Sequence, residues 1–234
     1  MTAPAEVAPQ VAAPERPARS RLFLRWFLDA LLAWMAGLAL LLPVVVAGIV
    51  QEGRTMFVFP DTTVSSWVVT TLATCVTGVV AWRRLRRARL KETPLLPAWA
   101  APEAGWWKGL LAACAAVGVA QLAMALALHV FNAGPSADPL MAAFPRAGSG
   151  ALWPAIILIV LVGPVSEELL YRGLLVGRFV AYGYPFAGMA LSGATFMLAH
   201  GDWRRFPFYF AFGVVLAWLY RRTRSLWPPL AFTC

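Results

Sequence analysis

The chain has 234 residues, of which 60% are hydrophobic and only 13% are charged, and its net charge is +9. Because soluble domains have roughly 45–50% apolar and about 25% charged residues, these values argue against a soluble enzyme, a disordered chain and a disulfide scaffold. They predict an all-α fold, a polytopic transmembrane helical bundle. Of the three cysteines, Cys75 and Cys114 lie inside apolar runs and do not suggest a disulfide or metal framework. We predict neither a metal site nor another cofactor.

In chain order, residues 1–20 are rich in proline and alanine and are expected to form a disordered cytoplasmic tail. Six apolar stretches follow as predicted full spans, and a last apolar run of nine residues is too short to cross a bilayer. We expect either that the chain is truncated within this seventh span or that the segment is re-entrant. The N-terminal group of three spans occupies residues 21–150, and a C-terminal group occupies residues 151–234. The predicted spans are 30–50, 64–82, 109–131, 151–165, 185–200 and 206–220, with the incomplete one at 226–234.

The positions of the basic residues predict the orientation. With a cytoplasmic N-terminus, 16 of the 20 Lys and Arg residues lie on the inner side, as the positive-inside rule requires. We therefore expect an integral protein of a bacterial inner membrane with its N-terminus in the cytoplasm. The basic run at 83–91 then faces anionic headgroups, so membrane lipids are the predicted partners of these charges and nucleic acid is not.

Ionisable side chains at membrane depth are costly and each needs an explanation. An ion pair with Arg25, four residues earlier, explains Asp29. A hydrogen-bonded position at the membrane interface explains His129. These two residues need no catalytic role.

Glu167 and Glu168 follow fifteen apolar or small residues, in the segment PVSEELLYRG at 164–173. Glu168 and Arg172 have the i,i+4 spacing of an ion pair along one helix face. Glu167 points about 100° away from Glu168 and has no predicted partner within its helix. Pro164 removes a helix hydrogen bond and predicts a kink just before the pair. A buried Glu–Arg clamp that only packs helices is the alternative explanation.

His200 ends the next apolar span. If the turn between the two helices lies near Tyr182, Glu167 is 15 residues before the turn and His200 is 18 residues after it. Both side chains then lie at a similar depth in an antiparallel helix pair. A carboxylate and an imidazole that meet in a cavity can activate a water molecule. The alternative is a capping or interfacial histidine.

The pattern Glu167-Glu168-x-x-x-Arg172 followed by Phe196-x-x-x-His200 resembles the first two motifs of the CAAX-protease and bacteriocin-processing (CPBP, abortive-infection) family of intramembrane glutamic endopeptidases. The segment RRTRSLWPP at 221–229 resembles the approach to the third motif of that family. The resemblance covers residue 151 to the C-terminus. It implies that Glu167 activates water, that His200 holds this water, that Glu168 and Arg172 order the site and that Phe196 packs beside it.

The third motif of the family departs from the pattern here. The position of its histidine falls near Thr233, and its asparagine would lie beyond Cys234. Because an oxyanion donor contributes about 10²–10³ in rate, the resemblance implies an impaired or inactive enzyme if the motif is missing. The sequence has no His-Glu-x-x-His zinc motif, no serine-nucleophile motif and no pair of intramembrane aspartates.

The sequence thus favours an intramembrane endopeptidase that acts on a peptide or protein with a membrane-proximal segment, either a prenylated CAAX protein or a C-terminal tail. A non-catalytic membrane immunity or assembly factor that keeps the protease fold is the main alternative. A small proton-coupled transporter with Glu167 as its proton relay is the third.

Overall fold

The computed structural model describes residues 24–37, 39, 64–91, 99–130, 150, 152–200 and 203–233. The predicted tail at 1–20, the end of the predicted first span and Cys234 lie outside these residues. The described part of the chain is helical and contains no strand. This confirms the predicted all-α fold class.

The helices have the following bounds. The first described helix covers residues 24–37. Two long helices follow, α2 (Val64–Lys91) and α3 (Trp106–Val130). The next helix is continuous but changes its hydrogen-bond pattern along its length: α5 (Leu152–Ile156), η2 (Ile157–Val162), α6 (Gly163–Glu167), η3 (Glu168–Val176) and α7 (Gly177–Ala181). The chain ends with α8 (Pro185–His200), the short η4 (Trp203–Arg205), α9 (Phe206–Thr223) and α10 (Trp227–Thr233).

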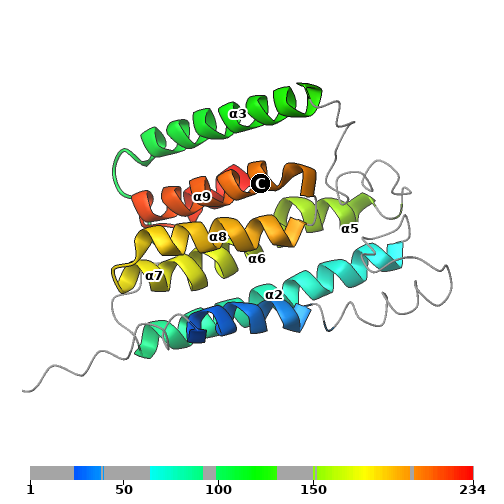
Figure 1. Cartoon of the computed structure of the whole chain (residues 1–234). Coiled ribbons are helices and arrows are strands. Elements are labelled where there is room, and N and C mark those ends of the chain that lie inside the picture. Colours follow the sequence, from blue (N-terminus) through cyan, green and yellow to red (C-terminus); the bar gives the residue numbers. More distant parts are fainter. Residues whose placement is uncertain are drawn as a thin grey trace, which may run out of the picture.

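These helices lie roughly side by side in a layered bundle (Figure 1). The order across the bundle is α3, α9, α8, the α5–α7 helix and then α2, and neighbouring members of this order contact one another. The helix at 24–37, blue in Figure 1, lies against α2. The main hydrophobic core runs through the middle of the bundle and contains buried residues of η3, α8 and α9.

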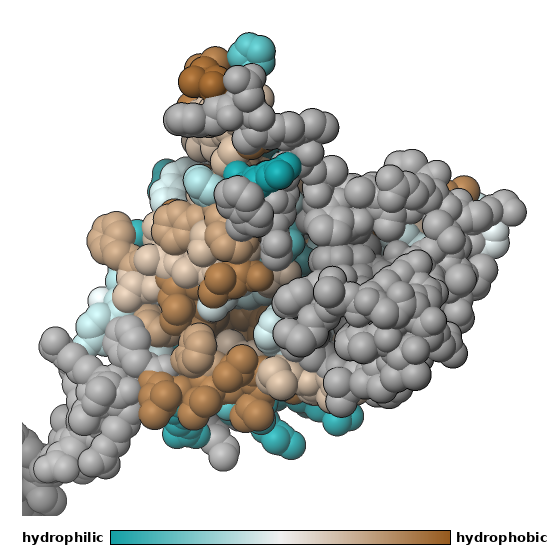
Figure 2. Space-filling model, turned by 45° about the vertical axis from the view of Figure 1, so that its right-hand side comes forward, coloured by the Kyte–Doolittle hydropathy of each residue, from teal (hydrophilic) through white to brown (hydrophobic). Residues whose placement is uncertain are grey.

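Three helices in the described part of the chain are long and apolar enough to cross a membrane, at Trp67–Ala88, Trp106–Val130 and Leu152–Ala181. Helix α8 has 16 residues, about 24 Å at 1.5 Å per residue, which is shorter than a hydrocarbon core of about 30 Å. The predicted count of six full spans therefore stays a prediction. Large apolar side chains are exposed along α3, where Leu122 is 72% accessible. Figure 2 shows such apolar residues over much of the described face, with hydrophilic residues along its lower edge. The protein is an integral membrane protein with a helical bundle.

The predicted span 151–165 is longer in the structure, where it continues through the double glutamate to Ala181. One π-helical segment precedes the motif and the other contains Glu168 and Arg172: the Gly163 N–H donates to the Leu158 carbonyl after η2, and the Gly177 N–H donates to the Arg172 carbonyl after η3. Pro164 lacks an N–H and follows directly after the first wide turn, which accommodates it. A Cβ on Gly163 would lie 2.9 Å from the Leu158 carbonyl oxygen, so this turn favours glycine.

Helices α8 and α9 cross at two glycines. A Cβ on Gly213 would lie 2.9 Å from the Cα of Gly193 and 3.1 Å from the Cβ of Phe196. Small residues at such a crossing let two membrane helices approach with their backbones nearly in contact. This close approach holds α8, with Phe196 and His200, firmly against α9.

The predicted ion pair of Asp29 with Arg25 is wrong. The Asp29 carboxylate binds the guanidinium groups of Arg84 on α2 and of Arg178 on α7, the latter at 2.6 Å. Arg178 is only 4% accessible, and a buried guanidinium without a counter-charge is strongly destabilising. Arg25 is exposed and can be hydrated instead. The ion pairs tie the helix at 24–37 to two other helices.

Candidate functional site

The predicted pair of Glu168 and Arg172 is present in η3. The Glu168 carboxylate and the Arg172 guanidinium lie 2.9 Å apart, and both side chains are fully buried. The other Glu168 carboxylate oxygen and the Arg172 Nε and Nη2 atoms have no hydrogen-bond partner among the described residues. A buried ion pair with unsatisfied polar atoms is costly, so its presence here needs an explanation.

Phe196 joins the two motif-bearing helices. It is 2% accessible, and the Arg172 guanidinium lies over its ring, 5.0 Å from the centroid. Tyr171 of η3 packs against the same ring edge-on, with centroids 5.5 Å apart. Since α8 packs against η3 through these contacts, the first two sequence motifs are neighbours in space.

His200 lies one turn after Phe196 at the end of α8. Its Nδ1 is 2.8 Å from the Phe196 carbonyl oxygen. Because a carbonyl only accepts hydrogen bonds, Nδ1 carries the proton that this contact needs, and in the neutral ring Nε2 is then an acceptor. The ring also stacks on Tyr209 of α9, with centroids 4.1 Å apart and planes 26° apart. Both contacts restrict the orientation of the imidazole.

Glu167 is the last residue of α6 and is half-buried at its junction with η3. It interacts with other residues of the protein. The predicted water shared by Glu167 and His200 stays a prediction, as does the catalytic role of either residue.

Thr233 lies near the end of α10, and its hydroxyl donates to the carbonyls of Pro229 and Leu230 in the same helix. The neighbouring Phe232 packs on Phe212 of α9, with ring centroids 5.8 Å apart. Phe212 in turn lies 5.7 Å from the Phe196 ring. A row of aromatic rings therefore connects Phe232, the neighbour of Thr233, with Phe196 of the site. The assignment of position 233 to a third motif stays a prediction.

Ser225 fixes the segment that leads into α10. Its hydroxyl donates to the Ala100 carbonyl at 2.6 Å and accepts from the Trp227 N–H at 3.2 Å. The start of α10 is thus capped, and Pro228 near its first turn needs no hydrogen-bond donor there. The segment fixes where α10 begins against the rest of the bundle.

Two tyrosines of the site escaped the sequence analysis. Tyr171 lies between the predicted residues Glu168 and Arg172, and Tyr209 lies in the predicted span 206–220, but neither tyrosine was assigned a role from the sequence. The spacing of Tyr171 one residue before Arg172 could have drawn attention to the first, whereas no sequence signal points to the stacking of Tyr209 on His200.

Among the described residues, no group of three or more His, Cys, Asp or Glu side chains is arranged to hold a metal ion. The site of the described chain is thus built from one buried ion pair, one half-buried carboxylate, an imidazole and a cluster of aromatic rings.

Two comparisons with known proteins gave a match. Residues 149–233 match the family of type II CAAX prenyl endopeptidases described as Rce1-like. A Bacillus subtilis (strain 168) protein named "Putative membrane peptidase YdiL" is 34% identical over 76 residues, which are 32% of this chain and 31% of that protein. The match thus spans about a third of the relative's length. No solved structure gives a significant match. The segment 149–233, with its double glutamate and its Phe-x-x-x-His sequence, is the part of the chain that is similar to the Rce1-like family, hence the Rce1-like domain.

Proposed function

We propose that the protein is an intramembrane endopeptidase that hydrolyses a peptide bond with a water molecule activated by Glu167. The observation that carries the proposal is the packing of Phe196 on Arg172 and Tyr171, because it sets the double-glutamate segment beside the helix that bears His200. The Rce1-like domain and the relative named as a membrane peptidase support the same class of reaction. Neither comparison favours a non-catalytic membrane factor.

In the proposed reaction, Glu167 takes a proton from water while the water oxygen forms a bond with the carbonyl carbon of the substrate. The tetrahedral intermediate breaks down when Glu167 gives this proton to the amide nitrogen. The C–N bond then breaks, and a carboxylic acid and an amine leave the site. His200, held through Nδ1 by the Phe196 carbonyl, orients the water through Nε2.

The buried ion pair positions the base. Arg172 neutralises Glu168, and its guanidinium lies between this carboxylate and the Phe196 ring. Glu167 directly precedes Glu168 in the same continuous helix. A rigid η3 therefore fixes the direction in which the Glu167 carboxylate points. We infer that Glu168 and Arg172 act as positioning residues.

The substrate class that we propose is a peptide whose scissile bond lies close to the membrane, either a prenylated C-terminal CAAX segment or a C-terminal protein tail. Membrane lipids surround the bundle and bring such substrates to it. The apolar exterior in Figure 2 is consistent with entry from the lipid phase.

The test is the cleavage of two internally quenched peptides, one with a farnesylated CAAX end and one without the lipid, by the purified protein in micelles. Glu167→Gln should abolish cleavage, whereas the matched control Glu103→Gln, at an exposed carboxylate of the loop before α3, should keep it. His200→Ala should lose as much activity as Glu167→Gln. The double variant should be little worse than either, because groups that act on one water are not additive. Full activity of Glu167→Gln would exclude it as the base, and additive losses would exclude a shared water.

A further inference from the structure

We propose that an apolar pocket beside the candidate site receives one large apolar side chain of the peptide substrate, and that the helix at 24–37 sets its size. This inference rests on the proposed function and deepens it. The pocket lies between the helix at 24–37, η3 and α8.

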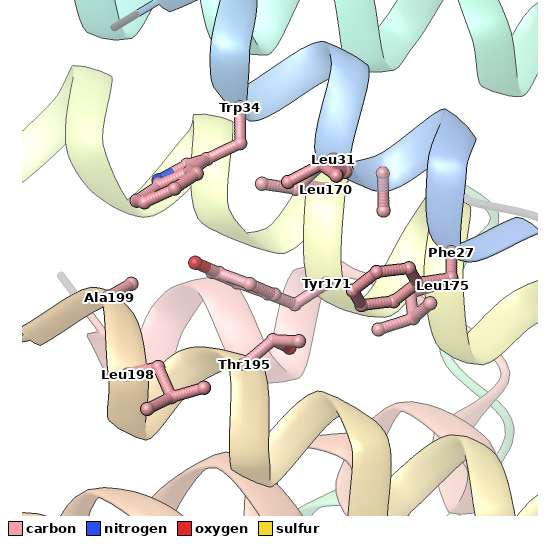
Figure 3. Close-up of a pocket in the computed structure, with 10 residues that line it drawn as sticks. Phe27, Leu31, Trp34, Leu170, Tyr171, Leu175, Thr195, Leu198 and Ala199 are labelled. Atoms are coloured by element: carbon pink, nitrogen blue, oxygen red, sulfur yellow. The ribbon is translucent and has the colours of Figure 1, made fainter.

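The pocket is next to the residues already described. Its wall includes Tyr171, which packs on Phe196, and Ala199, which directly precedes His200. In Figure 3 the Tyr171 hydroxyl points between Trp34 and Ala199. A group bound in this pocket therefore contacts Tyr171, which belongs to the aromatic cluster, and the turn of α8 that bears His200, where we expect a residue of the substrate near its scissile bond.

The chemistry of the wall selects an uncharged group. No residue that lines the pocket carries a charge. Thr195 supplies a hydroxyl, but this hydroxyl donates to the Leu191 carbonyl of its own helix at 2.8 Å. The Tyr171 hydroxyl and the Trp34 indole N–H are the other polar groups of the lining, and neither is charged. Since a charged side chain would lose its hydration here without a counter-charge, the pocket favours an aliphatic or aromatic side chain.

The size of the pocket selects a single side chain. Its volume is about 150 Å³, and an apolar cavity of about this size holds one benzene molecule. A leucine, methionine or phenylalanine side chain fits this space. A smaller side chain would leave part of the cavity empty.

One wall of the pocket comes from outside the Rce1-like domain. Phe27, Ala30, Leu31 and Trp34 all belong to the helix at 24–37, whereas the domain covers residues 149–233. The ion pairs of Asp29 with Arg84 and Arg178 hold this helix in place, and the Trp26 ring packs on Phe179 with centroids 5.2 Å apart. A wall that is fixed in this way gives the pocket a defined width, which is what discrimination between side chains requires.

The first experiment measures kcat and KM for peptides in which the residues beside the scissile bond are changed in turn to Ala, Leu or Phe. One position should show a preference for Leu and Phe over Ala of about 10–200-fold in kcat/KM. Ala30→Leu fills the pocket and should reduce this preference at least tenfold, mainly through KM. Leu32→Ala is the matched control, because Leu32 is on the same helix but is exposed and does not line the pocket. An unchanged preference in Ala30→Leu, or an equal change in Leu32→Ala, overturns the proposal.

The second experiment needs no turnover, so that failure of the proposed function and failure of the pocket can be told apart. A photoreactive benzophenone side chain replaces Phe27, in the pocket wall, or Leu28, which is exposed and outside it, in the Glu167→Gln background. Crosslinking to a Phe-containing peptide should occur from position 27 and not from position 28, and excess Ala-containing peptide should not compete. Crosslinks to lipid alone, or equal crosslinking from both positions, overturn the pocket assignment whether or not the enzyme cleaves. Crosslinking from position 27 alone, in a protein whose wild-type form does not cleave, supports the pocket and rejects the proposed function.

Discussion

Replacement of Gly213 by alanine should separate α8 from α9. The new Cβ would lie 2.9 Å from the Gly193 Cα, whereas two carbon atoms in favourable contact lie about 3.5–4.0 Å apart. The two backbones must therefore move apart by roughly 0.5–1 Å. Overpacking of this kind costs about 1–3 kcal/mol in free energy of unfolding.

Gly118→Ala on α3 is the matched control, because a Cβ there meets no atom within 4 Å. Each substitution gains the same helix propensity, about 1 kcal/mol, so this gain cancels when the two variants are compared. Unfolding followed by circular dichroism in mixed micelles should show that Gly213→Ala is less stable than Gly118→Ala by about 1–3 kcal/mol. Peptide cleavage should fall as well, because the same Cβ would press on Phe196. Equal stability of the two variants would refute the close helix crossing.

Glu168→Gln should lower the free energy of unfolding by about 3–5 kcal/mol, because it leaves the buried Arg172 without its counter-charge. Glu103→Gln, which affects only an exposed pair, should lower it by about 1 kcal/mol or less. Equal losses in the same unfolding assay would contradict the burial of the Glu168–Arg172 pair. Ser225→Ala should cost about 0.5–2 kcal/mol and speed amide hydrogen exchange at the start of α10; unchanged exchange there would show that the hydroxyl does not cap this helix. A cysteine in place of Arg87, in a cysteine-free background, should react with a membrane-impermeant maleimide only after the cells are permeabilised, and labelling of intact cells would reverse the predicted orientation.

Local spacing predicted part of the structure well. The i,i+4 pair of Glu168 and Arg172 and the helix that carries Phe196 and His200 follow from the pattern of residues along single helices. The same local reasoning ended the apolar stretch at residue 165, where the chain runs on into the charged segment, and it expected the helix turn near Tyr182, where the structure has it. In the structure the Arg172 charge neutralises that of Glu168 inside the helix, and the buried helix continues.

Interactions between distant segments were not predictable in this way. Asp29 pairs with residues 55 and 149 positions further along the chain, and helix periodicity carries no information about such partners. The stacking of Tyr209 on His200 depends likewise on how α9 lies against α8. The helix at 24–37 can be recognised as a wall of the pocket only from the structure, which shows the lining residues, together with the limits of the Rce1-like domain.

The wide turns of the α5–α7 helix have a consequence for comparing related sequences. A π-helical turn contains one residue more than the α-helical turn it replaces, so it is the structural form of a single-residue insertion. Loss of one residue from η2 would let the rest of Ile157–Val162 return to α-helical geometry, and the helix after it would keep its face, because the wide turn takes up the extra residue locally. Loss of one residue from α5, which has no wide turn, would instead rotate everything after it by about 100°. A relative that is one residue shorter at η2 can therefore still present the glutamates in the same direction, with an α-helical turn in place of the wide one.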